Sequence, residues 1–408
     1  MSPGPAPDEL LESRRVVVCV GTGGVGKTTL SAALALAAAR RGRRVLVLTI
    51  DPARRLADAL GVSELGNRPQ ALPRERLERL GVPDEGALSA MMLDMKRTFD
   101  DLVERFAESP EARDRILENP IYQHVSDALA GSAEYSAMEK VYELAEQKDV
   151  DLIVLDTPPS QHALDFLEAP ERLLGFLDSR VVQLLLHPAF AAGRVGFRVF
   201  QRGAARVLRT LEKISGVGFL EDVSEFLLAF EGMSEGFRER ARRVQALLFG
   251  PETAFVVAAA PARESVLHAA AFLDRLEQTR AGVAGIVVNR IHLWPEDEPP
   301  DTARDEAGVA TLARALAAGA PEGFDARAAA DAALDALGEY AILVTRDARN
   351  VEPLRERARA RGYFWRCVPL LDRDVHDLEA LSRVASFVLD DGNGHGRRRG
   401  DRLGAEAS

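Results

Sequence analysis

The stretch Val16–Ala35 constrains the fold of this chain more than any other. It has five apolar residues, then a glycine-rich turn, then a helical run rich in alanine and leucine (VVVCVGTGGVGKTTLSAALA). Gly21, Gly26, Lys27 and Thr28 fit the phosphate-loop pattern G-x-x-x-x-G-K-[ST]. Because this pattern lies between a strand pattern and a helix pattern, we predict a site for the phosphates of a nucleotide.

The chemistry of phosphate binding explains the residue types in this loop. Backbone N–H groups must point inward at the anion, and glycines adopt the required path cheaply. The following helix adds its unpaired N–H groups and the positive end of its dipole. We expect Lys27 to reach the β- and γ-phosphates and the Thr28 hydroxyl to reach Mg²⁺. The predicted nucleotide-binding residues of the loop are Gly21, Thr22, Gly23, Gly24, Val25, Gly26, Lys27, Thr28 and Thr29.

Two carboxylates follow other predicted strands. Asp51 comes after the apolar run 44–50 and either orients an attacking water, holds the magnesium shell or only caps the next turn. Asp156 ends the run DLIVLD, which is the usual setting of a Walker-B-type acid. Ligands of parallel α/β sheets bind beyond the carboxyl ends of the strands. We therefore predict Thr28, Asp51 and Asp156 around a metal, with Asp51 and Lys27 as the catalytic residues.

Two further strand ends are candidates for binding the base. Asn289 ends the run IVVN, and its amide offers both a donor and an acceptor to a base edge, although many loops begin with Asn for turn reasons alone. Pro369 follows the last predicted strand, where backbone groups would help form the base pocket.

Alternation of apolar strand runs with helices predicts an α/β fold, a doubly wound and mostly parallel sheet flanked by helices. We expect one P-loop nucleotide-binding domain over residues 14–390, with disordered tails at 1–13 and 391–408. Helical patterns at about 87–148 and 162–250 predict a helical insertion subdomain. Residues 295–335, acidic and then rich in alanine, predict a solvent-exposed insertion.

The overall composition excludes several classes of protein. The net charge of −11 disfavours nucleic-acid binding, which needs a basic surface. The two cysteines, Cys19 and Cys367, are too few and too separated for a disulfide framework or a thiolate metal site. The sequence has no apolar signal core and no run of about 18 apolar residues. We expect a cytoplasmic protein, at most peripheral to a membrane.

These motifs resemble the ArsA-type anion-transporting ATPases, which are relatives of the ATPase that delivers tail-anchored membrane proteins. The matching segments are GTGGVGKTT from Gly21, TIDPARRLADALG from Thr49, VLDTPPSQHALDFL from Val154 and VPLLDRDVHDLEAL from Val368, with VVNR at Val287 in the place of the base-reading strand. The resemblance implies ATP, Mg²⁺ and hydrolysis. It implies that Asp51 orients the hydrolytic water, that Asp156 supports the metal and that Asn289 reads adenine.

The chain departs from this family's pattern in two ways. Thr22 stands where the loop usually carries a second lysine that reaches the partner's phosphates in a dimer. A homodimer or a heterodimer with a related subunit is implied, with Arg54 or Arg55 as a candidate replacement for that charge. The chain also lacks the Cys-x-x-Cys zinc pair and the cysteine triad of arsenite pumps, and it resembles a bacterial-type member.

The resemblance also implies that residues 162–250 accept a hydrophobic client. A stripe at Phe226, Leu227, Phe230, Met233 and Phe237 is either core or groove. The stripe Arg194, Arg198, Arg202, Arg206 and Arg209 is either a solvated face or a contact for anionic lipid or an acidic partner. His162 either passes on the presence of the γ-phosphate or only starts a helix.

Three functions remain open from the sequence. The first is a Mg²⁺-dependent ATPase whose nucleotide state switches a helical subdomain that binds a protein client or a membrane partner. The second is the catalytic subunit of an arsenite or anion efflux pump. The third is a nucleotide-gated scaffold with negligible hydrolysis. A partitioning ATPase fits less well because it leaves the helical insertion unexplained.

Overall fold

The computed structural model describes residues 7–51, 54–119, 122, 132–157, 171, 175, 234–279, 281–294, 306–321 and 323–389. Eight strands form one sheet in the order β3-β4-β2-β5-β1-β6-β7-β8. Their bounds are β1 Val16–Gly21, β2 Arg44–Thr49, β3 Gln70–Ala71, β4 Ala87–Met92, β5 Leu152–Asp156, β6 Thr253–Ala259, β7 Val283–Ile291 and β8 Phe364–Pro369. Every neighbouring pair is parallel except β3 with β4. The prediction of a doubly wound, mostly parallel sheet is confirmed.

The strands read as continuous apolar runs because helices cover both faces of the sheet. In β1, Val17 and Cys19 point into one core, and Val16, Val18 and Val20 point into the other. The first face carries α1 Pro7–Ser13, α2 Lys27–Ala39, α3 Arg55–Leu60, α4 Arg74–Arg79 and α19 Leu378–Leu389. The second face carries α8 Ser132–Glu146, α15 Ser234–Leu248, α16 Arg263–Gln278 and the C-terminal part of α18 Ala326–Arg361.

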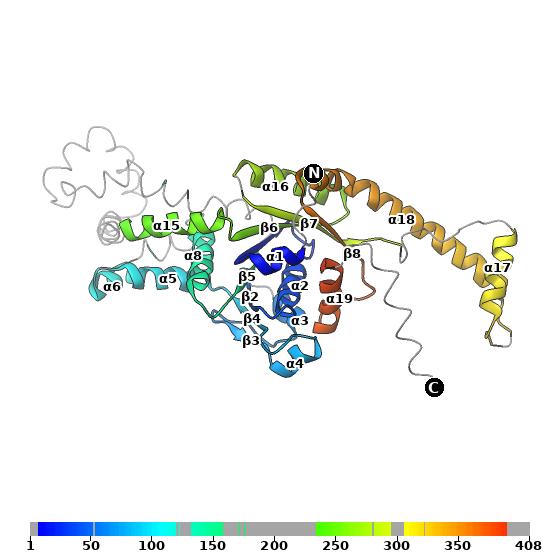
Figure 1. Cartoon of the computed structure of the whole chain (residues 1–408), viewed down its shortest axis with the longest axis horizontal. Coiled ribbons are helices and arrows are strands. Elements are labelled where there is room, and N and C mark those ends of the chain that lie inside the picture. Colours follow the sequence, from blue (N-terminus) through cyan, green and yellow to red (C-terminus); the bar gives the residue numbers. More distant parts are fainter. Residues whose placement is uncertain are drawn as a thin grey trace, which may run out of the picture.

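Two groups of helices extend beyond the sheet at opposite ends of the molecule (Figure 1). At one end, α5 Met95–Phe106 and α6 Pro110–Glu118 lie beside α8 and α15. At the other end, α18 projects outward and carries α17 Glu306–Ala317 at its tip. We call α17 and the projecting part of α18, residues 326–345, the arm. The sequence predicted an exposed insertion at 295–335. In the structure the last ten of these residues are the start of α18, a 36-residue helix that runs on to Arg361.

The segment 87–92 was expected to be helical and is instead strand β4. Leu88 and Ala90 point into one core and Met91 into the other, and the strand pairs in parallel with β2. Alanine, leucine and methionine favour helices, but that local preference is worth less than burial on both faces of a sheet. The helix of this region begins only at Met95, where the Asp94 side chain caps it by accepting from Arg97 N at 3.0 Å.

The N-terminal segment also differs from the expectation of a loose tail up to residue 13. Pro7–Ser13 forms α1, and its Leu10 and Leu11 are fully buried against the first face of the sheet. Two adjacent leucines in a short polar segment gave too weak a periodic pattern to indicate a helix.

Several predictions lie outside the described residues. They concern His162, the stripe Arg194–Arg209, and Phe226, Leu227, Phe230 and Met233 of the apolar stripe. The described part of the chain contains no helix that is both long and apolar enough to cross a membrane.

Candidate functional site

The phosphate loop connects the end of β1 to the first turn of α2. At Gly21 a side chain is impossible, since its Cβ would lie 2.3 Å from the carbonyl oxygen of Ala258 on β6. Gly26 caps α2 with a left-handed backbone, φ 88°, and its missing Cβ leaves room for Asn289. The N-terminus of α2 therefore faces the loop with free N–H groups, which is the geometry that binds anions.

Lys27 lies across this loop rather than in solvent. Its ammonium donates to the carbonyl oxygen of Thr22 at 2.9 Å, and the residue is only 7% exposed. Burial lowers the pKa of Lys27, and the negative charges of Asp156 and Asp51 act in the opposite direction. The lysine and both carboxylates are thus within electrostatic reach of one another, as the sequence predicted.

Asp156 is the most constrained residue of the site. Its Oδ2 accepts from Thr28 Oγ1 at 2.7 Å and from Thr49 Oγ1 at 2.9 Å. The residue is 1% exposed, and its other carboxylate oxygen, Oδ1, is buried without a hydrogen-bond partner among the described residues. A buried carboxylate oxygen that lacks a donor is an unsatisfied group that a cation would satisfy.

Burial raises the pKa of Asp156 from 3.8 to about 6, although hydrogen bonds from Thr28 and Thr49 and the charge of Lys27 lower it. A bound Mg²⁺ would favour the ionised carboxylate in the same way that Lys27 does. Hydroxyl and carboxylate oxygens are the ligands that Mg²⁺ takes beside phosphates. The residues present therefore fit this ion, since Thr28, Asp156 and the nearby Asp51 offer oxygen atoms that could hold it.

Asp51 follows directly after β2 at the same edge of the sheet. Its backbone N–H donates to Thr49 Oγ1 at 3.2 Å, so Thr49 links the Asp51 and Asp156 segments. Asp51 Oδ2 lies 3.5 Å from a guanidinium nitrogen of Arg55, an exposed side chain of the first turn of α3. Arg55 thus stands beside the predicted catalytic carboxylate, whereas Arg54 is the N-cap of α3.

Asn289 holds the phosphate loop from the other side. Its Nδ2 donates to the carbonyl oxygen of Val25 at 2.9 Å, and its Oδ1 accepts from Arg290 N at 3.0 Å. Arg290 has a left-handed backbone, φ 59°, and donates to the carbonyl oxygen of Gly24 at 3.3 Å. The predicted base-reading amide is therefore also a brace for the loop.

A pocket lies where the ends of β7 and β8 meet α2 and α19. Its lining includes Thr29, Asn289, Pro369, Leu370, Leu371 and Val375. The structure thus brings together Asn289 and Pro369, which are 80 residues apart in the sequence. The lining also includes the charged residues Arg290, Arg373 and Asp374, so an apolar wall stands beside polar groups that could orient a bound ligand.

The sequence assigned no role to three residues of this edge. Thr49 is a hydroxyl within an apolar strand, Arg290 looked like an ordinary residue after the strand, and Ser265 on α16 lies 3.5 Å from Thr22 with the two hydroxyl oxygens facing each other. No short motif encodes such contacts, because the partners are distant in sequence. Cys19 is buried in β1, where burial raises its pKa to about 12 and favours the neutral thiol.

A family model described as "Anion-transporting ATPase" matches residues 14–307. An "ATPase ASNA1 homolog" of Trypanosoma cruzi is 28% identical over 317 residues, which cover 73% of this chain and 80% of the relative. "ATPase GET3" of Malassezia globosa is 32% identical over 162 residues, 40% of this chain and 44% of the relative. "ATPase ARSA1" of Chlamydomonas reinhardtii is 27% identical over 301 residues, 69% of this chain and 35% of the relative. The chain spans about a quarter to a half of the length of the first curated relatives it matches.

Proposed function

Because this chain belongs to the anion-transporting ATPase family, we propose that it binds ATP with Mg²⁺ at the edge described above and hydrolyses it. The observation that carries the proposal is the Asp156 carboxylate. It is buried, held by the hydroxyls of Thr28 and Thr49, and left with one oxygen that has no hydrogen-bond partner among the described residues.

Each residue of the site has a proposed task. The loop amides and Lys27 hold the phosphates, and Lys27 exchanges the Thr22 carbonyl for a phosphate oxygen when the nucleotide binds. Thr28 and Asp156 hold the metal, which when bound neutralises charge on the β- and γ-phosphate oxygens. Asp51 orients the attacking water, because it emerges beside Asp156 with its carboxylate only part-buried.

The base is proposed to enter the pocket beside Pro369 and Asn289. The Asn289 amide already donates to the carbonyl oxygen of Val25. Binding of adenine by this amide would therefore be coupled to the position of the phosphate loop. A base that breaks the hydrogen bond from Asn289 to Val25 would loosen the phosphate loop. A base that leaves this bond intact would preserve the phosphate site.

We further propose that the nucleotide state acts on the helical subdomain and on a partner. Asp156 ends β5 and is followed by the segment predicted to switch, and α15 leads from the client-binding region back into the sheet at β6. The client would be a hydrophobic protein or a membrane surface. The active form would be a homodimer or a heterodimer with a related subunit, in which Arg55 or a partner's cation replaces the lysine missing at Thr22.

A second candidate is a nucleotide-gated scaffold that binds ATP and hydrolyses it negligibly. Thr22 favours it, since its side chain faces Ser265 and brings no positive charge to the phosphates. An arsenite pump subunit is not favoured, because the thiol of Cys19 is buried in β1 and that of Cys367 lies on β8 at the far edge of the sheet.

Single-turnover hydrolysis of bound ATP tests these proposals. We expect Asp51→Asn to bind MgATP within about threefold of the parent and to hydrolyse it about 100-fold more slowly, in the range for a positioned general base. Asp58→Asn, an exposed acid on α3, serves as the matched control. Binding without measurable turnover in the parent would support the scaffold, and no calorimetric binding of MgATP would refute both functions.

A further inference from the structure

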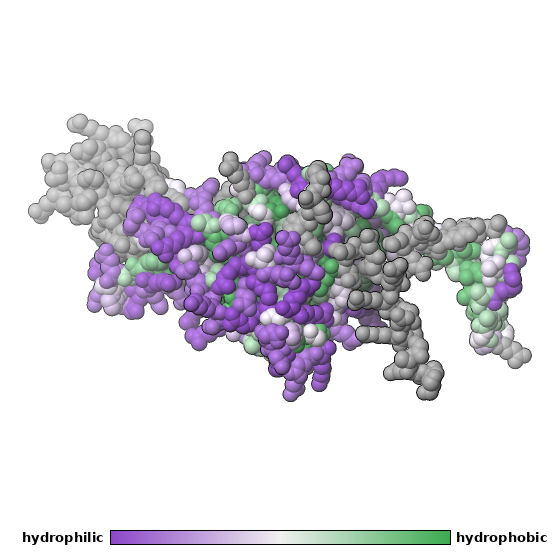
Figure 2. All heavy atoms as spheres, in the orientation of Figure 1, coloured by the Kyte–Doolittle hydropathy of each residue, from purple (hydrophilic) through white to green (hydrophobic). Residues whose placement is uncertain are grey.

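The arm has one face that neither α17 nor the sheet covers. On the projecting part of α18, Ala330 and Leu334 are buried against α17. Further along, Val351, Leu354 and Ala358 are buried against the sheet. These two buried faces lie on one side of the helix, so the opposite side is exposed over 331–349 as far as the described residues go. Figure 2 shows how far the arm stands away from the body, with apolar residues gathered where α17 and α18 meet.

The open face carries a stripe of exposed residues with an ordered charge pattern. Its spacing is four, four, three, four and three residues, which keeps all members within about 80° of the helix circumference at 100° per residue. The stripe starts acidic, has one apolar residue in the middle and ends basic. Its members are Asp331, Asp335, Glu339, Ile342, Arg346 and Arg349, which are all exposed.

Ile342 is the centre of this pattern. It is 69% exposed, the largest exposed fraction among the large hydrophobic residues of the described chain. Asp335 lies seven residues before it and Arg349 seven residues after it, about 10.5 Å away in each direction along the axis. The stripe is therefore complementary to a copy of itself that runs the opposite way.

We propose that this stripe, residues 331–349 of α18, is an antiparallel docking surface for a second copy of this chain. Two copies related by a twofold axis at Ile342 place the isoleucines against each other. They also place Asp335 of each chain opposite Arg349 of its partner. Glu339 comes near Arg346 of the partner subunit, a guanidinium that also pairs with Asp347 of its own chain at 2.9 Å. This is an isologous contact, in which one patch serves both subunits. A parallel arrangement would instead place like charges opposite each other.

The charge order is what selects a second copy over an unrelated partner. An unrelated partner needs no acidic half and basic half on either side of one apolar residue, with Asp335 and Arg349 at equal distances from it. The stripe lies beyond residue 307, where the match to the family model ends. The contact is a single helix pair about 30 Å long, so we expect a salt-sensitive dimer rather than a permanent one.

Site-specific crosslinking tests the twofold axis and the register. In a Cys367→Ser background, which leaves only the buried Cys19, we expect Ile342→Cys to crosslink with itself through a short bismaleimide. Asp335→Cys and Arg349→Cys are expected to stay uncrosslinked alone and to crosslink when the two proteins are mixed. Leu267→Cys on α16, 60% exposed, is the control for random encounter.

Charge reversal tests the pairing by sedimentation without nucleotide. Asp335→Arg alone and Arg349→Asp alone are each expected to weaken the dimer at least tenfold, because each homodimer then opposes like charges twice. A mixture of the two variants restores dimer formation, since both cross-pairs become complementary. A monomeric parent at 100 µM, no Ile342→Cys crosslink above the Leu267→Cys control, or self-crosslinking of Asp335→Cys would each overturn the proposal.

Discussion

Replacing the buried carboxylate Asp156 by asparagine separates the stability of this fold from its ligand chemistry. Asp156→Asn keeps the size of the side chain and the oxygen that accepts from Thr28 and Thr49. It removes the negative charge that burial makes costly. We therefore expect a protein that is more stable without ligand and that no longer gains stability from Mg²⁺ and ATP.

The magnitude follows from the pKa of Asp156, which burial raises from 3.8 to about 6. The folded chain holds this proton more tightly than the unfolded chain, so stability without ligand falls as the pH rises from about 4 through about 6. Above that range the full cost is about 3 kcal/mol, at 1.36 kcal/mol per pKa unit. The new amide group replaces Oδ1, which has no partner among the described residues, and leaving it unsatisfied returns about 1 kcal/mol of that gain.

The assay is chemical unfolding in EDTA at pH 8 and pH 5, for the parent and for Asp156→Asn. We expect the variant to be more stable by about 2 kcal/mol at pH 8, and this advantage to shrink toward zero at pH 5, where the parent carboxyl is protonated. Added MgATP is expected to raise the melting temperature of the parent only. A variant that is less stable than the parent at pH 8, or an advantage independent of pH, would refute the reasoning.

Three further predictions concern other parts of the molecule. Gly26→Ala would place a Cβ 2.2 Å from Asn289 Nδ2 at a left-handed φ, and we expect calorimetry to show more than a tenfold loss of MgATP affinity. Gly24→Ala, left-handed but with open space around it, should lose distinctly less, and equal losses would contradict the steric argument. Glu139→Ala should destabilise the fold by about 3–5 kcal/mol in guanidinium unfolding. The reason is that the buried Arg240, which lies 2.5 Å from the Glu139 carboxylate, loses its counter-charge. A loss below about 1 kcal/mol would show that the pair is solvated. MgATP binding at pH 6 should release a proton from the buried Asp156 carboxyl. Calorimetry would then show a binding heat that depends on the ionisation enthalpy of the buffer. An equal binding heat in all buffers would contradict this prediction.

Most strands of the sheet, and the strand ends that meet at the site, could be predicted from the sequence. The pattern from Val16 to Thr28 was decisive because its glycines, lysine and threonine are required together by one ligand chemistry. Asp51 and Asp156 could be placed beside it because parallel strands direct their carboxyl ends to a single edge. The family resemblance was confirmed by the match over residues 14–307.

The errors have a common physical cause, which is that tertiary burial decides what local preference leaves ambiguous. The run 87–92 has good helix formers, yet it pairs with β2 and is buried on both faces. Leu10 and Leu11 are a pair too short to show a period, yet they seal one face of the sheet. The secondary structure of these two segments can be assigned correctly only when the elements that pack against them are known.

The details of the site that sequence did not indicate are contacts between distant segments. The hydroxyl of Thr49 reaches Asp156 across 107 residues, and the amide of Asn289 reaches Val25 across 264. The unsatisfied Asp156 Oδ1 is a property of packing and has no counterpart in a motif.

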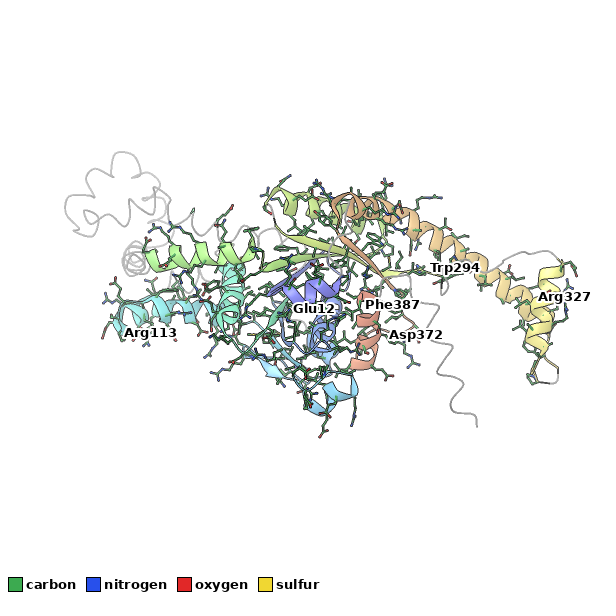
Figure 3. The ribbon with its side chains drawn as sticks, in the orientation of Figure 1. Glu12, Arg113, Trp294, Arg327, Asp372 and Phe387 are labelled. Carbon is green, nitrogen blue, oxygen red and sulfur yellow. The ribbon has the colours of Figure 1, made fainter. Side chains whose placement is uncertain are left out.

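The end of β7 ties the arm to the nucleotide edge. Three residues after Asn289, His292 contacts the buried Asp347 of α18, with Nδ1 2.6 Å from Oδ2, and Tyr340 donates to Leu293 O at 2.9 Å. Trp294 lies beside the middle of α18, and Arg327 marks its far tip (Figure 3). About 30 Å of helix separates Asp347 from that tip, so a tilt of roughly 5° at the anchor would sweep the tip by about 3 Å. If the pocket beside Asn289 binds a base, the anchor of the arm lies three residues from it, and a small movement there would be amplified at the outer end of the arm.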